Sequence, residues 1–168
     1  MVHAYYSNGK GKTSTANGIA LRALGSGMKV LYSQFMKNGD SMECAILKKL
    51  DNLTFLVSDT KYELFDSSDI SKKQCYTNAY SSLLDNINSV ASDFDMIILD
   101  EILDCIYFDY VKKDMLTEFL KCNSKREIIL TGHSIDEDIL SLCDYASKIE
   151  HIKHPYDKGI SARKGIEY

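Results

Sequence analysis

The sequence lacks the features that mark membrane, secreted and zinc-ribbon proteins. No stretch approaches the roughly 20 apolar residues of a membrane-spanning helix, and the N-terminus has no basic segment followed by an apolar one, as a secretory signal would. The five cysteines are widely spaced and form no C-x-x-C pair, so neither a disulfide framework nor a zinc ribbon is expected. We therefore expect a cytoplasmic protein that contacts no membrane, with reduced thiols, three of them buried in helices.

The sequence also lacks an excess of basic over acidic residues, because its formal net charge is −4. This balance argues against a nucleic-acid-binding protein, although a local basic patch would still serve a small polyanion. The chain has no internal repeats, low-complexity tracts or linker-like segments, and hydrophobic residues make up 45% of it, as in ordinary globular proteins. We expect one domain covering residues 1–168.

Short apolar runs alternate along the chain with segments of helical periodicity. The apolar runs predict strands at residues 2–6, 29–35, 53–57, 95–101, 126–132 and 146–152. The periodic segments predict helices at residues 13–24, 42–50, 71–90 and 111–121, and a further helix that ends at Leu142. Ser134 and Glu137 have the spacing of a capping box for that last helix. The polar segment 59–69 is expected to be a loop over the working face of the sheet.

The strands are continuous apolar runs rather than alternating ones, and helices separate them. This combination predicts an α/β fold with a mostly parallel β-sheet that is flanked by helices on both faces. Ligands of such sheets bind at the carboxyl ends of the strands. The loop after the first strand, the pair Asp100 and Glu101, and the turn after Thr131 should therefore meet in one crevice.

The loop after the first strand resembles a phosphate-binding loop with one glycine missing. The standard pattern G-x-x-x-x-G-K-[ST] needs glycine at position 6, where this chain has Tyr6, but Gly9, Gly11, Lys12 and Thr13 are present. Glycines let successive N–H groups turn inward, and the following helix adds the positive end of its dipole. Lysine supplies charge for phosphate oxygens, and the threonine hydroxyl suits Mg²⁺. The loop predicts nucleotide binding.

Asp100 and Glu101 end a buried apolar strand. Such a pair alone is more often a solvated strand end, but together with the phosphate loop it predicts a Mg²⁺ site, in which Thr13, Asp100 and Glu101 are the candidate ligands. His151 and His154 form a weaker candidate, because Pro155 favours an extended backbone at His154 and no third ligand is near in sequence. We expect no metal there.

Nearly the whole chain is covered by segments in a recognisable order: NGKGKTS, LRALG, QFMKNG, IILDEI, LTGHSIDEDILSLCDYASKI and KHPYDKGISARKGIEY. Together they resemble the P-loop type of ATP:corrinoid adenosyltransferase, and the last segment is the most specific. The resemblance implies a P-loop NTPase (RecA-like) three-layer sandwich. It also implies that a Co(I) corrinoid attacks the 5′-carbon of ATP and releases triphosphate. The family's loop is offset by one residue and holds ATP in reversed polarity, so Tyr6 is expected, whereas Ser7 stands where the family usually has glycine.

The same resemblance assigns residues to roles. Lys12, Thr13 and Glu101 would be catalytic, with Glu101 in the shell of Mg²⁺ or Mn²⁺, and Arg22 would lie near the nucleotide. The triphosphate would be bound by Asn8, Gly9, Lys10, Gly11, Lys12, Thr13 and Ser14, and weaker assignments are Lys37, Asp157 and Arg163. Since Co(I) is itself a strong nucleophile, the protein would need no general base, only positioning and charge stabilisation.

An aromatic-lined site removes the lower axial ligand of Co(II) in that family. This sequence contains no tryptophan, so our hypothesis is that Tyr62 and Phe65 face the corrin; the alternative, equally weighted, is that they pack on the core. His133 stands where the family commonly has arginine. It would contact phosphate or the corrinoid, or else lie in an exposed turn.

The resemblance further implies a homodimer and a reduced flavoprotein as electron donor. Family members often carry a segment before the first strand that covers the partner's site, whereas this sequence starts at that strand. Two other functions use the same loop and acids. One is a phosphate-cleaving P-loop ATPase or kinase with Glu101 positioning water or an acceptor, and the other is a non-catalytic nucleotide-binding module. The sequence leaves open which corrinoid is the substrate.

Overall fold

A computed structural model describes residues 1–63 and 70–166. In these residues six strands form one sheet in the order β3-β2-β4-β5-β1-β6, and every pair of neighbours is parallel. The strands are β1 (Val2–Tyr6), β2 (Val30–Gln34), β3 (Leu53–Val57), β4 (Met96–Asp100), β5 (Glu127–Gly132) and β6 (Tyr145–Lys148). The predicted parallel sheet is confirmed.

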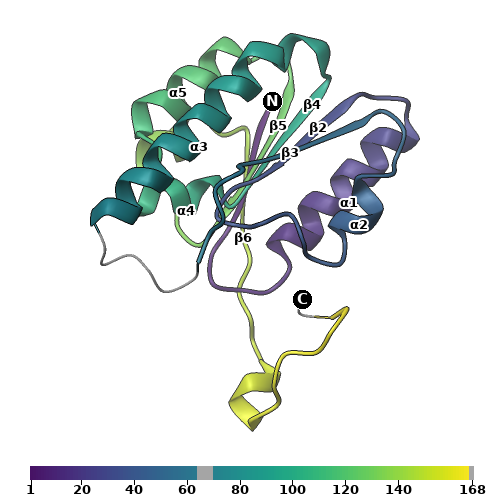
Figure 1. Ribbon diagram of the computed structural model, residues 1–168. Helices are drawn as coiled ribbons and strands as arrows, with labels where there is room; N and C mark the ends of the chain where they lie inside the picture. The colour runs from purple at the N-terminus through teal and green to yellow at the C-terminus, as the bar shows by residue number, and fades with distance from the viewer. Residues whose placement is uncertain (64–69, 167–168) are drawn as a thin grey trace.

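Helices cover both faces of this sheet (Figure 1). One face carries α1 (Lys12–Gly25) and α2 (Cys44–Leu47), and the other carries α3 (Ile70–Val90), α4 (Ile102–Tyr107), α5 (Lys113–Cys122) and α6 (Glu137–Ser141). Along β4, Ile97 and Leu99 pack under α3 and α5, whereas Met96 and Ile98 pack under α1. Both faces of the strand are therefore buried, which explains its unbroken apolar sequence.

The strand register aligns the carboxyl ends that are expected to form the site. Tyr6 of β1 pairs with Gly132 of β5, and Gln34 of β2 pairs with Asp100 of β4. β5 lies between β1 and β4, so the phosphate loop and the acidic strand end are two strands apart. The predicted meeting of these segments at one edge of the sheet is confirmed.

The structure corrects several local predictions. Helix α4 follows β4 directly and had not been predicted, because six residues are too few for a periodic pattern to stand out. The capping box at Ser134 is wrong: the cap of α6 is Asp136, whose carboxylate accepts the N–H of Asp138 at 2.9 Å. The helix predicted at 42–50 is confined to Cys44–Leu47. Residues 59–63 contain neither helix nor strand, as expected of a loop.

The thiols and the C-terminal segment complete the fold. Cys44 and Cys105 are buried, whereas Cys75 and Cys122 are exposed, so two helical cysteines face solvent.

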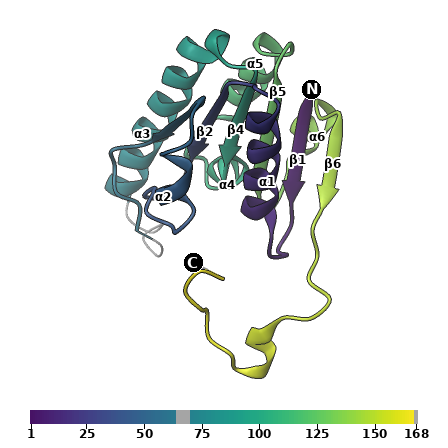
Figure 2. The same cartoon turned by 90° about the vertical axis from the view of Figure 1, so that its right-hand side faces the viewer.

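After the exposed edge strand β6 the chain leaves the sheet and forms a short 3₁₀ helix at Pro155–Lys158, away from the body (Figure 2). None of the described helices combines the length and the apolar character needed to cross a membrane.

Ile98→Ala tests the buried face beneath α1. Ile98 is fully buried, so its truncation should reduce the free energy of unfolding by about 2–5 kcal/mol, measured by urea denaturation. Ile46→Ala is the matched control, because Ile46 is 65% exposed and should change that free energy by less than about 0.5 kcal/mol. Equal effects of the two substitutions would contradict the assigned core.

Candidate functional site

The loop between β1 and α1 is held tightly at both of its sides. The N–H of Ser7 donates to the carbonyl of Gly132 at 3.2 Å, and the N–H of Gly9 donates to the carbonyl of Ile149 at 2.9 Å. A Cβ on Gly9 would overlap with that Ile149 carbonyl, so only glycine permits this close approach. Gly11 precedes α1 with φ of 117°, a left-handed value that suits glycine. The loop conformation therefore depends on its glycines.

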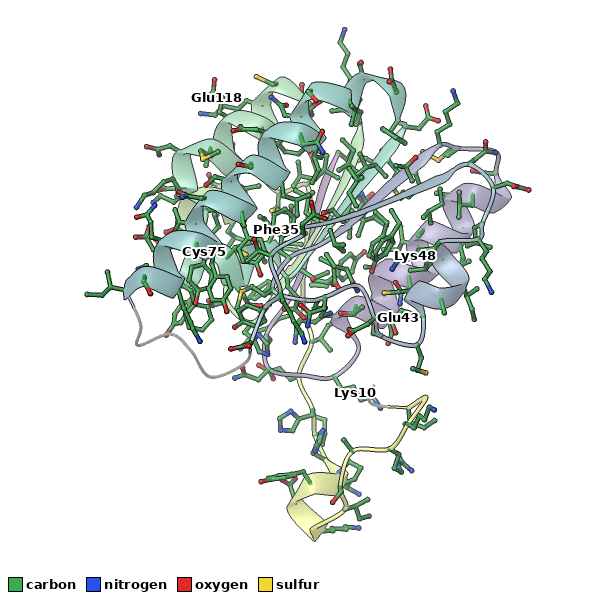
Figure 3. All side chains as sticks on the ribbon, viewed as in Figure 1. Lys10, Phe35, Glu43, Lys48, Cys75 and Glu118 are labelled. Atoms are coloured by element: carbon green, nitrogen blue, oxygen red, sulfur yellow. The ribbon has the colours of Figure 1, made fainter. Side chains whose placement is uncertain are left out.

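Lys12 lies inside the loop. Its side chain is buried, and the Nζ donates to the carbonyl oxygens of Ser7 at 2.8 Å and of Gly9 at 3.2 Å. A positive charge is thus placed within the loop, at the N-terminus of α1, where the helix dipole also favours an anion. Figure 3 shows Lys10 on the same loop, on the side that faces the C-terminal segment.

Asp100 is the fully buried centre of a hydrogen-bond network at the end of β4. Its Oδ1 accepts from the hydroxyls of Thr13 at 3.0 Å and Thr131 at 2.7 Å. Its Oδ2 accepts from Lys37 Nζ at 2.8 Å and from Gln34 Nε2 at 3.4 Å. The structure thus brings Thr13 and Asp100, both predicted to be metal ligands, into direct contact.

Lys37 links Asp100 to Glu101. The Nζ of Lys37 lies 3.2 Å from Glu101 Oε1 and also donates to Thr13 Oγ1 at 3.0 Å. Burial opposes the charge on Lys37, but the carboxylates of Asp100 and Glu101 outweigh it and raise the pKa of Lys37 above its ordinary value. Burial raises the pKa of Glu101, and a hydrogen bond with Asp104 acts in the same direction. The ammonium of Lys37 thus lies among oxygen atoms of Thr13, Asp100 and Glu101.

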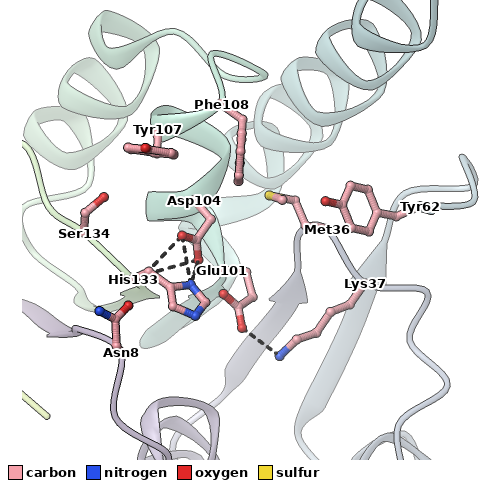
Figure 4. A pocket seen from close by; sticks show the side chains of 10 residues that line it. All are labelled: Asn8, Met36, Lys37, Tyr62, Glu101, Asp104, Tyr107, Phe108, His133 and Ser134. Atoms are coloured by element: carbon pink, nitrogen blue, oxygen red, sulfur yellow. Dashed lines mark hydrogen bonds and ion pairs between the residues drawn. The ribbon is translucent and has the colours of Figure 1, made fainter. Parts of the chain in front are cut away.

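A cavity of about 630 Å³ adjoins this network (Figure 4). Figure 4 shows aromatic side chains along one side and the charged groups of Glu101, Asp104 and Lys37 on the other. Tyr107, which is 70% exposed, and Phe108 come from the end of α4. The lining residues are Asn8, Met36, Lys37, Tyr62, Glu101, Asp104, Tyr107, Phe108, His133 and Ser134. The cavity thus combines an apolar wall with a charged floor.

Asp104 fixes the turn after β5. Its carboxylate is buried and accepts the backbone N–H of His133 at 3.1 Å, and it lies 3.1 Å from Nδ1 of the same histidine. Gly132 makes this contact possible, because a Cβ there would lie 2.6 Å from the Cβ of Leu103. His133 lines the cavity and its side chain is 57% exposed, so it borders the cavity and also lies in an exposed turn.

Other predicted residues lie in different places. Tyr62 lines the cavity and its ring centroid lies 5.3 Å from that of Tyr76, so it both packs on the core and borders the site. Phe65 falls outside the described residues. Arg22 lies in the last turn of α1, about 15 Å along the helix axis from Lys12, and does not join the cluster. The carboxylate of Asp157 accepts the N–H of His154 in the cap of the 3₁₀ helix. Arg163 belongs to the exposed tail.

Five residues that line the cavity had not been predicted as site residues, namely Met36, Asp104, Tyr107, Phe108 and Ser134. Asp104, Tyr107 and Phe108 all depend on α4, the helix that the periodicity analysis missed. The one available signal was their position soon after the acidic strand end, in the run DEILDCIYFD. Residues that closely follow a strand's carboxyl end often line the site of a parallel sheet.

The chain is similar to proteins of one family over its whole length. Residues 1–168 match the model of a family described as ATP:corrinoid adenosyltransferase BtuR/CobO/CobP. The corrinoid adenosyltransferase of Escherichia coli (strain K12) is 30% identical over 175 residues, which cover 100% of this chain and 85% of that protein. Corrinoid adenosyltransferase CobA of Salmonella typhimurium is 29% identical with the same coverage, and the Pseudomonas aeruginosa corrinoid adenosyltransferase is 29% identical, with 100% and 82% covered.

Among solved structures, a DNA replication initiation factor aligns with 89% of this chain and 39% of its own. The identity is 15% and the TM-score is 0.45.

Ser7→Gly tests the strain in the phosphate loop. Ser7 has φ of 103°, a value that serine rarely adopts, so replacing it with glycine relieves backbone strain. Glycine also makes the unfolded chain more flexible, which opposes this gain. The net result should be a free energy of unfolding that is higher by about 1 kcal/mol. Ser82→Gly is the control, because Ser82 is an exposed residue within α3 and its replacement should lower that energy by about 0.5 kcal/mol. Thermal or urea denaturation measures both, and a loss of stability in Ser7→Gly would contradict the strained loop.

Proposed function

Since the chain belongs to the ATP:corrinoid adenosyltransferase family and is thus a transferase with ATP and a corrinoid as substrates, we propose that it acts on the Co(I) corrinoid and releases inorganic triphosphate. The observation that carries this proposal is the contact between the phosphate loop and the aromatic-walled cavity. Asn8 of the loop lines the cavity, and Lys37 both lines it and donates to Thr13 at the start of α1. A nucleotide on the loop and a large planar substrate in the cavity would meet there.

The proposed step displaces triphosphate from carbon. The electron pair of Co(I) forms a bond to the 5′-carbon of ATP, the C5′–O bond breaks, and its electrons leave with the triphosphate oxygen; cobalt becomes formally Co(III). Because cobalt is the nucleophile, the protein needs no group that removes a proton. Its tasks are to hold the two substrates in line and to stabilise the charge that develops on triphosphate. Lys12 and the N–H groups at the start of α1 suit the second task.

Mg²⁺ or Mn²⁺ belongs to the same proposal. Thr13 and Asp100 offer oxygen ligands in direct contact, and Glu101 follows at the same strand end, which is the type of ligand set that hard divalent cations prefer. The ammonium of Lys37 among these oxygens supports a site that accepts positive charge. The ion would neutralise part of the triphosphate charge and so favour its departure.

We further propose that the aromatic wall encloses the corrinoid. Tyr62, Tyr107 and Phe108 border the cavity on one side, and aromatic surfaces favour a large apolar macrocycle from which water must be excluded. Such enclosure would help to keep the lower axial ligand off cobalt and so ease reduction of Co(II). On the resemblance alone, a reduced flavoprotein would supply the electron and two chains would form a homodimer.

Lys12→Ala tests the nucleotide half of the proposal. With ATP, Mg²⁺ and a chemically reduced corrinoid, the wild-type protein should form one triphosphate for each adenosylated corrinoid. Loss of the Lys12 charge should reduce kcat/KM about 100-fold or more, whereas Lys121→Ala, at an exposed position of α5, should leave it unchanged. Product chromatography and the corrinoid absorption spectrum measure both. Corrinoid-independent release of orthophosphate would instead support a phosphate-cleaving ATPase or kinase.

Tyr62→Ala and Tyr107→Ala test the aromatic wall. Each should slow turnover about tenfold when the assay starts from Co(II) with a reductase, and much less when Co(I) is supplied, because the wall acts on reduction. Tyr145→Ala is the control, since Tyr145 is exposed on the edge strand β6, away from the cavity. Wild-type rates for both variants in the Co(II) assay would refute the assignment.

A further inference from the structure

We propose that Glu101, Asp104 and His133 form a binding site for a transition-metal ion such as Zn²⁺. One ligand atom from each residue lies within 4.8 Å of the others. The three side chains meet on the floor of the cavity (Figure 4). Glu101 is the one member shared with the proposed Mg²⁺ site, whereas Asp104 and His133 line the cavity in which the corrinoid is proposed to bind.

The distance between the ligand atoms of Asp104 and His133 fits a small divalent ion. Nδ1 of His133 lies 3.1 Å from each carboxylate oxygen of Asp104. Bonds from Zn²⁺ to nitrogen or oxygen are about 2.0–2.2 Å, so neighbouring ligands are about 3.4 Å apart in tetrahedral geometry and about 3.0 Å apart in octahedral geometry. The observed spacing lies between these values. A metal ion would take the place of the hydrogen-bonding proton between Asp104 and His133, but off the line that joins Nδ1 to the carboxylate, so the imidazole ring would have to turn.

The charges around the cluster favour a cation. Asp100, Glu101 and Asp104 lie within one short segment, and the ammonium of Lys37 pairs with the first two of them. Asp104 is 7% exposed at its side chain, and in the described part of the chain its ion-pair partner is His133, which is charged only when protonated. A divalent ion would offset this excess of negative charge.

The backbone holds the three residues in place before any ion arrives. Asp104 stands in the first turn of α4, directly after Glu101 and the end of β4. The turn that carries His133 is fixed to Asp104 through its own N–H, and Gly132 lets that turn approach Leu103 closely. Ligands that are fixed by their supporting contacts lose little entropy on binding.

The ligand types point to a class of metal. An imidazole with two carboxylates suits Zn²⁺, Co²⁺ or Mn²⁺ better than Mg²⁺, which prefers oxygen ligands alone. His133 is 57% exposed at its side chain and faces the cavity, so a fourth position would remain open to water or to a substrate oxygen. Metal sites with three protein ligands and one open position are typical of chemically active sites rather than structural ones.

The test is calorimetric titration with Zn²⁺ in the absence of ATP and corrinoid. All proteins carry Cys75→Ser and Cys122→Ser, because those two exposed thiols would otherwise bind zinc. We expect one ion per chain. Both Asp104→Asn and His133→Gln should lower the affinity for Zn²⁺ by at least about tenfold. Asp104→Asn keeps an oxygen for the N–H of His133, so its fold should be preserved, and a circular dichroism spectrum checks this. The absorption of bound Co²⁺ reports the geometry independently.

A double variant, His151→Gln with His154→Gln, is the matched control. Those two rings lie 5.4 Å apart in the tail and are the rival imidazole site. Binding should survive in this control. The proposal is overturned if no ion binds, if Asp104→Asn and His133→Gln bind as tightly as their parent, or if the tail variant loses the ion. Because neither ATP nor a corrinoid is present, these outcomes are independent of whether the chain transfers an adenosyl group.

Discussion

The buried carboxylate of Asp100 is the interaction on which the site depends. It lies fully buried at the end of β4 and accepts hydrogen bonds from Thr13, Gln34, Lys37 and Thr131, which come from the start of α1, the end of β2 with the loop after it, and β5. A buried charge is tolerated only when it is paired and hydrogen-bonded in this way. The hydrogen bonds that stabilise the Asp100 charge therefore also connect the phosphate loop, the edge of the sheet and the cavity.

This arrangement suits a reaction in which the protein supplies position and charge rather than a proton-transfer group. Lys12 is held inside the loop by two carbonyl oxygens, so its charge is in place before a ligand binds. Lys37 spans from the start of α1 to the acids of the cavity floor. Family membership gives ATP and a corrinoid as the substrates, and the network explains how both would be held against each other.

Much of the fold could be predicted from the sequence, whereas the cavity could not. Buried parallel strands leave unbroken apolar runs, and the phosphate loop leaves glycines at fixed positions, so both features are local and readable. Tyr107 and Phe108 depend on the six-residue helix α4, too short for a periodic pattern, and on tertiary contacts that bring its end over the sheet edge. At α6, Ser134 and Asp136 are equally good caps by type; the extended backbone of Asp136 before Glu137 selects it.

Turnover with β,γ-methylene ATP tests the central claim most directly, namely that the bond broken is C5′–O and no phosphate is cleaved from another. This analogue has a carbon bridge between its last two phosphates, which a phosphate-cleaving enzyme cannot break, but its 5′-carbon is unchanged. The account predicts that the protein, supplied with the analogue, Mg²⁺ and a Co(I) corrinoid, forms the adenosylated corrinoid and releases the intact methylene triphosphate. Failure to form any cobalt–carbon bond, together with orthophosphate release from ATP itself, would contradict it.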